Sequence, residues 1–166
     1  MLRRRTPRTA ELSRAQVVDA AHEIVASLKL RVVEAFFWHA SCNDQGESPF
    51  RGQMRIAYPP AATFADSDAQ IAQMVQQLRD AGWSPDPGFH SHGTALTKNN
   101  VVVVFGPQNV SDPNREVELF GECRDVASTN DHQRTRGAGC PGVTLAWFHE
   151  HSGARGRRPR LARGSA

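Results

Sequence analysis

Residues 50–58 read Phe-Arg-Gly-Gln-Met-Arg-Ile-Ala-Tyr, and apolar and polar side chains alternate along them. A period of two with one apolar face is typical of a half-buried strand in an antiparallel sheet. Pro59 and Pro60 end this predicted strand, because proline cannot donate to the hydrogen-bond ladder. The expected fold is therefore built on an antiparallel sheet with one covered face.

Four further strands are predicted on either side of residues 50–58. Before them, residues 31–40 are rich in β-branched and aromatic side chains, as expected of a buried strand, and the polar residues 41–49 form a turn. After them, strands are expected at residues 90–97, 101–105 and 115–123. Lys98-Asn99-Asn100 is the expected tight turn between the first two of these, because asparagine tolerates a positive φ.

Two amphipathic helices are predicted from apolar residues at helical spacing. Ser13 and Ser67 are each followed three residues later by glutamine, which matches the capping box of a helix start. The first helix is therefore expected over residues 14–28, and the second begins after Ser67. Gly82 is placed to end the second helix in a left-handed turn.

The predicted order is α-β-β-α-β-β-β, an α+β fold with two helices packed on one face of a mainly antiparallel sheet. Short links between successive strands favour a meander. The opposite face of the sheet is expected to carry polar side chains, namely Arg51, Gln53, Arg55, Glu116 and Glu118.

A chain of 166 residues is long enough for one domain with a real core. Its net charge of +3 is unevenly distributed, since residues 9–131 hold nine basic and sixteen acidic side chains and the other arginines lie in the two ends. An acidic body argues against nucleic-acid binding, which needs a basic face. We expect residues 1–11 to be a disordered basic N terminus, residues 12–128 the α+β domain, and residues 129–166 a disordered tail rich in arginine and glycine.

The sequence indicates no membrane anchor. The longest apolar run, residues 101–105, is far too short to span a bilayer. Arg3, Arg4 and Arg5 have the charge of a signal-peptide start, but polar residues 6–11 follow where an apolar segment is needed. We therefore expect neither an export signal nor a transmembrane segment in this chain.

Two histidines are the strongest candidates for a chemical site. His90-Ser91-His92 would place two imidazoles on one face of a strand, a spacing that a metal can use, but no third or fourth ligand accompanies them. No nucleophile stands in an activating context, and no glycine-rich phosphate loop occurs. We therefore expect no catalytic residue, no metal site and no cofactor, and we interpret Trp38 and Trp83 as core or rim residues.

Cys42 and Cys123 each lie at the end of a predicted strand. If the two strands are neighbours, the two α-carbons can come within the roughly 4.4–6.8 Å that a disulfide requires. The alternative is a pair of buried reduced thiols, as in a cytosolic protein. The residues alone leave both states open.

Four motifs follow one another along the chain: Ser-Cys-Asn-Asp-Gln-Gly at 41–46, Gly-Trp at 82–83, His-Gly-Thr-Ala-Leu-Thr-Lys-Asn at 92–99 and Gly-Glu-Cys-Arg at 121–124. Through them, roughly residues 12–126 resemble small cell-envelope lipoproteins of mycobacteria. The resemblance implies secreted, lipid-anchored proteins in an oxidising compartment, which favours a Cys42–Cys123 disulfide. That family begins with a signal peptide and a lipidated cysteine, whereas no cysteine precedes Cys42 here. Either the start is misplaced or truncated, or this copy is not exported.

Two classes of function follow from these observations. The first is a monomeric, non-enzymatic envelope domain that binds a protein, lipid or glycan partner through its sheet face or loops. The second is a small metal-using or hydrolase-like enzyme centred on His90 and His92. The first is favoured, because no acid–base pair or nucleophile completes a site.

Overall fold

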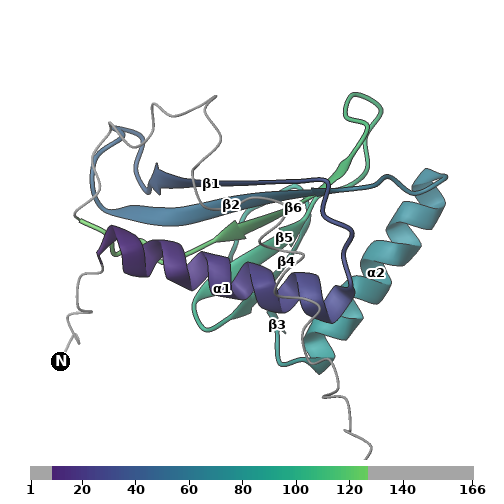
Figure 1. The fold of residues 1–166 in the computed structure, drawn as a ribbon, viewed down its shortest axis with the longest axis horizontal. Coiled ribbons are helices and arrows are strands. Elements are labelled where there is room, and N and C mark those ends of the chain that lie inside the picture. The colour runs from purple at the N-terminus through teal and green to yellow at the C-terminus, as the bar shows by residue number, and fades with distance from the viewer. Residues whose placement is uncertain (1–8, 127–166) are drawn as a thin grey trace, which may run out of the picture.

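In a computed structural model, the described residues, 9–126, form two helices and six strands (Figure 1). In chain order the elements are α1 (Ala10–Leu28), β1 (Glu34–Ser41), β2 (Phe50–Tyr58), α2 (Phe64–Asp80), β3 (Ser84–Pro85), β4 (Thr94–Lys98), β5 (Val101–Phe105) and β6 (Arg115–Phe120). The predicted α+β class and element order are confirmed, with the short strand β3 as an addition. The disorder expected for residues 1–8 and 129–166 concerns segments outside the described residues, whereas residues 10 and 11 already belong to α1.

The six strands of the described chain form one antiparallel sheet in the order β1-β2-β6-β5-β4-β3. The segment with α2 takes the chain from β2 to the far edge of the sheet. From there β3 to β6 form a meander that returns until β6 pairs with β2. The prediction of a simple meander is therefore wrong, because the second neighbour of β2 comes from a strand far away in the sequence.

Both helices begin earlier than the capping boxes predict. The N-caps are Thr9 and Thr63, whose hydroxyls accept hydrogen bonds from the backbone N–H three residues later at 3.2 and 3.0 Å. Ser13 and Ser67 lie about one turn further along and are fully buried. The upstream threonines prevail because an extra turn adds backbone hydrogen bonds without a new nucleation cost.

Two turn predictions are confirmed. Gly82 has a φ of 94°, and its N–H and that of Trp83 donate to carbonyls in the last turn of α2, both at 3.0 Å. This pair of bonds is the Schellman ending of a helix. Asn99 and Asn100 have φ values of 50° and 62° and connect β4 to β5 in a two-residue turn.

Both helices lie on the same face of the sheet and enclose the core with it (Figure 1). One row of buried side chains crosses five strands in register: Phe37, Met54, Leu119, Val103 and Leu96. The buried apolar side chains that the helices contribute are Val17, Val18, Ala21, Ile24, Val25, Ile71 and Leu78. The apolar side chains on one face of the strands thus pack against the apolar stripes of the two helices in one core.

The N-terminal half of α1 approaches the sheet most closely over two glycines, Gly52 in β2 and Gly121 just after β6. A Cβ atom on Gly52 would lie 2.7 Å from the carbonyl oxygen of Ser13, and one on Gly121 would lie 2.9 Å from Val17 Cγ2. The Gly52 N–H donates to the Ser13 hydroxyl at 2.9 Å. The helix can rest on the strands here only because both positions lack a side chain.

The opposite face of the sheet carries the predicted polar set, Arg51, Gln53, Arg55, Glu116 and Glu118. Phe120 of β6 lies among these residues, with the Arg51 guanidinium carbon 4.8 Å from its ring centroid and the Phe89 ring centroid at 5.0 Å. Burial lowers the pKa of Arg51 from its ordinary value, and Glu118 acts in the opposite direction. This part of the face is therefore covered by packed side chains.

Candidate functional site

Cys42 and Cys123 form a disulfide, with their α-carbons 6.0 Å apart. The strands that lead into it are not neighbours, however, because β2 lies between β1 and β6. Both flanking strands are antiparallel to β2 and therefore end where β2 begins. Two strands on either side of a third lie about 9.5 Å apart, so the segments beyond β1 and β6 must converge to form the bond.

The segment after β6 explains how this gap is closed. β6 ends at Phe120, rather than at Cys123 as predicted. Beyond it, Asp125 pairs with Phe50 at the start of β2 through two backbone hydrogen bonds of 2.6 and 3.0 Å. This pairing holds Cys123 over the first residue of β2, within reach of the loop that carries Cys42.

The loop of residues 41–49 is held by its own side chains. The Ser41 hydroxyl and the Asn43 amide group both donate to the Glu47 carbonyl, at 2.6 and 3.2 Å. Asn43 Oδ1 accepts the Glu47 N–H at 3.1 Å, and the Cys42 N–H donates to the Pro49 carbonyl at 3.0 Å. Polar residues of the motif at 41–46 therefore position one half of the disulfide.

His90 and His92 lie in the loop between β3 and β4, and both are exposed. The predicted strand over residues 90–97 is wrong at its start, because the Ser91 hydroxyl donates to the Gly93 carbonyl at 3.0 Å and accepts its N–H at 3.4 Å. This local turn delays β4 until Thr94. Within residues 9–126, no three histidine, cysteine, aspartate or glutamate side chains are grouped so that they can hold a metal ion.

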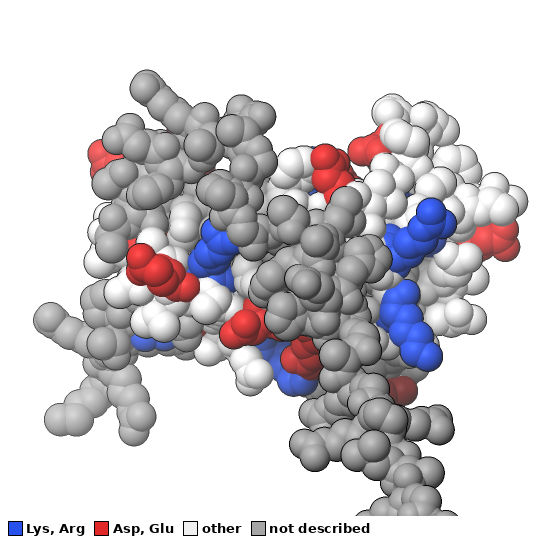
Figure 2. Space-filling model, viewed as in Figure 1, with Lys and Arg blue, Asp and Glu red and all other residues white. Residues whose placement is uncertain are grey.

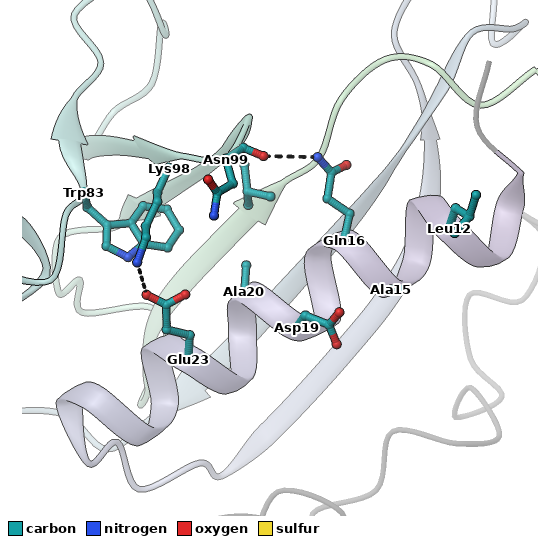
Figure 3. Close-up of a pocket in the computed structure, with 10 residues that line it drawn as sticks. Leu12, Ala15, Gln16, Asp19, Ala20, Glu23, Trp83, Lys98 and Asn99 are labelled. Atoms are coloured by element: carbon teal, nitrogen blue, oxygen red, sulfur yellow. Dashed lines mark hydrogen bonds and ion pairs between the residues drawn. The ribbon is translucent and has the colours of Figure 1, made fainter. Parts of the chain in front are cut away.

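A groove of about 400 Å³ opens between α1 and the β4–β5 hairpin (Figure 3). The wall from α1 consists of residues at helical spacing, namely Leu12, Ala15, Gln16, Asp19, Ala20 and Glu23. The opposite side is lined by Trp83 and by Lys98, Asn99 and Val101 of the hairpin. Small alanine side chains on the helix leave the space, and polar side chains surround it.

An ion pair crosses one end of the groove (Figure 3). Lys98 Nζ contacts Glu23 Oε1 and also donates to the Ala81 carbonyl, at the end of α2, at 2.9 Å. The Lys98 ammonium is therefore held by two acceptors from two different helices. Trp83, which also lines this part, is 3% exposed and belongs to the core cluster, in line with its interpretation as a core residue.

Gln16 makes a second link across the groove (Figure 3). Its amide nitrogen donates to the Asn99 carbonyl at 3.4 Å and to the Glu122 carboxylate at 3.0 Å, and its amide oxygen accepts the Glu122 N–H at 3.2 Å. One side chain thus joins α1, the hairpin and the segment after β6. Among the described residues, the side chains of Asp19 and Asn99 make no hydrogen bond or ion pair, so both are open to a ligand.

Acidic side chains outnumber basic ones in the described domain. Residues 9–126 hold fifteen acidic and nine basic side chains, and the two kinds are interspersed on the face seen in Figure 2. On the sheet face away from the helices, Arg55 lies 3.4 Å from Glu116 and 4.0 Å from Glu118. Burial raises the pKa of Glu116, Arg55 opposes this rise, and Asp112 and Glu118 add to it.

The family model described as "Putative lipoprotein LppJ" matches residues 9–141 of this chain. The chain belongs to the LppJ family. The proteins named LppJ in Mycobacterium tuberculosis and Mycobacterium bovis are each 37% identical to it over 128 residues. This region is 76% of the chain but 65% of each relative, so the chain spans less than two thirds of their length. No solved structure matches it.

Family membership confirms the resemblance to mycobacterial lipoproteins that the four motifs indicate. Neither of the two helices in the described domain combines the length and the apolar character that crossing a bilayer requires. Three of the motifs meet around the groove, since Trp83, Lys98 and Asn99 line it and Glu122 bonds to Gln16 behind it. The motif at residues 41–46 carries Cys42, and its disulfide partner Cys123 lies in the motif at 121–124.

The groove was not predicted from the sequence. Asp19 and Glu23 are one helical turn apart on α1, and this spacing was the available signal that two acids share one edge of the helix. The hairpin turn at Asn99 lies across the groove from α1 because of the position of β4 and β5 in the sheet. No local pattern fixes that position.

Proposed function

We propose that this domain is a non-enzymatic binding domain of the cell envelope and that it binds a partner protein in the groove between α1 and the β4–β5 hairpin. The observation that carries the proposal is the open groove of about 400 Å³, in which the side chains of Asp19 and Asn99 bond to no other residue of the described range 9–126. Membership of the LppJ family supports the envelope setting. The Cys42–Cys123 disulfide is in keeping with an oxidising compartment.

The lining of the groove favours a protein over a lipid or a glycan. A lipid chain needs an enclosed cavity without charged side chains, whereas this groove is open and Asp19, Glu23 and Lys98 are among its lining residues. A sugar ring commonly needs an exposed aromatic face to pack on, and Trp83 is 3% exposed. A polypeptide can offer backbone donors and acceptors to Asn99 and apolar side chains to Leu12, which is 56% exposed.

The enzymatic alternative rests on His90 and His92, and their placement does not favour it. Both are exposed in a loop without a third ligand from residues 9–126. Neither histidine is part of the groove lining. We therefore retain the binding domain as the proposed function.

The proposal is tested by backbone-amide NMR of the full chain, titrated in turn with a pool of short peptides, a soluble oligosaccharide and a short-chain phosphatidylcholine below its micelle concentration. We expect the peptides to shift amide signals of residues 12–23 and 98–101, and the other two probes to leave them unchanged. Ala15→Phe, which fills the groove from an exposed position of α1, should abolish the shifts. Gln73→Phe, on the exposed surface of α2, is the matched control and should retain them.

Shifts that gather on the open sheet face, or shifts in the groove caused by the lipid or the oligosaccharide instead of the peptides, would contradict the proposal. Peptide shifts that persist in the Ala15→Phe variant would contradict it as well. In each case the partner would have to bind elsewhere or belong to another class.

A further inference from the structure

The groove is richer in free acceptors than in free donors. Among the described residues that line it, Lys98 is the only basic one, and its ammonium already contacts Glu23 and the Ala81 carbonyl. Glu23 uses Oε1 in this pair, so Oε2 remains open. Asp19 has a whole carboxylate unpaired within the described chain, and it lies along the outer rim of the groove (Figure 3).

The two acids are one turn apart on α1. Positions i and i+4 on a helix have their Cβ atoms about 5–6 Å apart, so a single ammonium or guanidinium group can approach Asp19 and Glu23 together. Within residues 9–126, two basic side chains, Lys98 and Arg14, are engaged elsewhere. Lys98 is held on its two acceptors, and the Arg14 guanidinium lies over the Phe37 ring, 5.2 Å from its centroid.

The other end of the groove is apolar. Leu12 is 56% exposed and Ala15 is exposed beside it. Leu12 and Asp19 are seven positions apart on α1, a separation of about 10 Å along the helix axis. A polypeptide in the polyproline II conformation has three residues per turn and rises about 9 Å over three residues, so side chains three positions apart lie on the same side. A segment lying along α1 can therefore meet both features with two side chains three positions apart.

We infer that the occupant of the groove is a segment of a partner protein in the polyproline II conformation that presents a lysine or arginine to Asp19 and Glu23 and, three positions away, an apolar side chain to Leu12 and Ala15. This inference rests on the proposed function and specifies its partner. Complementary charge fixes the register of the segment and its direction along α1. A free small cation would pair with Asp19 and Glu23 but would leave Leu12 uncovered. Contact with Leu12 therefore distinguishes a partner segment from a free cation as the source of positive charge.

The test uses acetyl-Leu-Ala-Ala-Lys-amide as the probe and follows groove amide signals of the full chain by NMR at low salt. We expect binding to weaken at least fivefold when the probe lysine is replaced by norleucine. A probe with leucine and lysine in adjacent positions should also bind more weakly than the original probe. Asp19→Asn should weaken binding about three- to fivefold, the range of a partly exposed ion pair. Asp68→Asn, an exposed acid on α2, is the matched control and should have no effect.

Three results would overturn the inference: equal binding of the norleucine probe, an unchanged affinity of the Asp19→Asn variant, or equally tight binding of spermidine at the groove. If groove signals shift equally with every peptide, the specified charge is wrong while the proposed function stands. If no peptide shifts them, both are wrong. Added sodium chloride should weaken the binding of the lysine probe and leave any binding of the norleucine probe unchanged.

Discussion

Breaking the Cys42–Cys123 disulfide should cost the domain a large part of its stability. The two cysteines are 81 positions apart, and closing a loop of that length stabilises a protein by about 4.5 kcal/mol in the chain-entropy model. Domains of this kind are typically stable by about 5–15 kcal/mol. For a body of this size, the loss corresponds to a fall in Tm of roughly 15–20 °C.

The assay is urea unfolding followed by far-UV circular dichroism, in a Cys140→Ser background so that the third cysteine cannot form another bond. Cys42→Ser, Cys123→Ser and the double variant should lose equal free energies of unfolding, because each removes the same bond. The m value should rise, since an unfolded chain without the bond exposes more surface. Reductant should destabilise only the parent.

Either of two results would refute this reasoning. One is a loss below about 1 kcal/mol in Cys42→Ser, which is no more than an ordinary substitution costs. The other is a further loss when reductant is added to that variant. The first result would mean that the segments beyond β1 and β6 are held together by their packing and by the Asp125–Phe50 pairing instead. The second would mean that a different reducible bond contributes to stability.

Further predictions concern packing, pH and metal. Gly52→Ala should lower the free energy of unfolding by about 1–3 kcal/mol, because the new Cβ would lie 2.7 Å from a backbone oxygen. In Gly88→Ala the atom nearest to the new Cβ is at 3.6 Å, so this control should be near neutral in the same assay. Equal losses in the two variants would contradict the packing argument. The folded state holds the Glu116 proton more tightly than the unfolded state does, since its pKa is raised. Ionisation of Glu116 therefore weakens the fold as pH rises above the ordinary glutamate value of 4.5, and the Tm of Glu116→Gln relative to the parent should increase over that rise. A Tm difference that does not change with pH would show that Glu116 does not contribute. Replacing His90 and His92 by alanine should leave Tm and zinc uptake unchanged, and stoichiometric zinc binding that disappears in the double variant would reverse that expectation.

Sequence patterns predicted the fold where one residue type decides the local backbone. Asn99 and Asn100 tolerate the positive φ of the hairpin turn, Gly82 tolerates the left-handed end of α2, and the alternation over residues 50–58 requires a half-covered strand. These predictions are correct because the steric rule acts within a few residues. No distant part of the chain is needed to satisfy it.

The errors arise where two local solutions compete or where the partner is distant. Thr9 and Ser13 are both good helix caps, and the extra turn gained by starting at Thr9 decides between them, while the Ser13 hydroxyl accepts the Gly52 N–H instead. The pairing of β2 with β6 depends on the path of the chain through α2, which no strand pattern encodes. The groove has the same origin, because α1 and the hairpin turn at Asn99 line one groove only after that sheet order is set.

The claim that the groove is a binding site is tested most directly by site-specific photo-crosslinking of the full chain in the cells that produce it. A benzoylphenylalanine in place of Leu12, at the rim of the groove, should give a discrete protein adduct that the Ala15→Phe substitution removes. The same group in place of Gln73, on the exposed face of α2, should give none. An identical adduct from both positions, or no adduct that depends on Ala15, would contradict the claim.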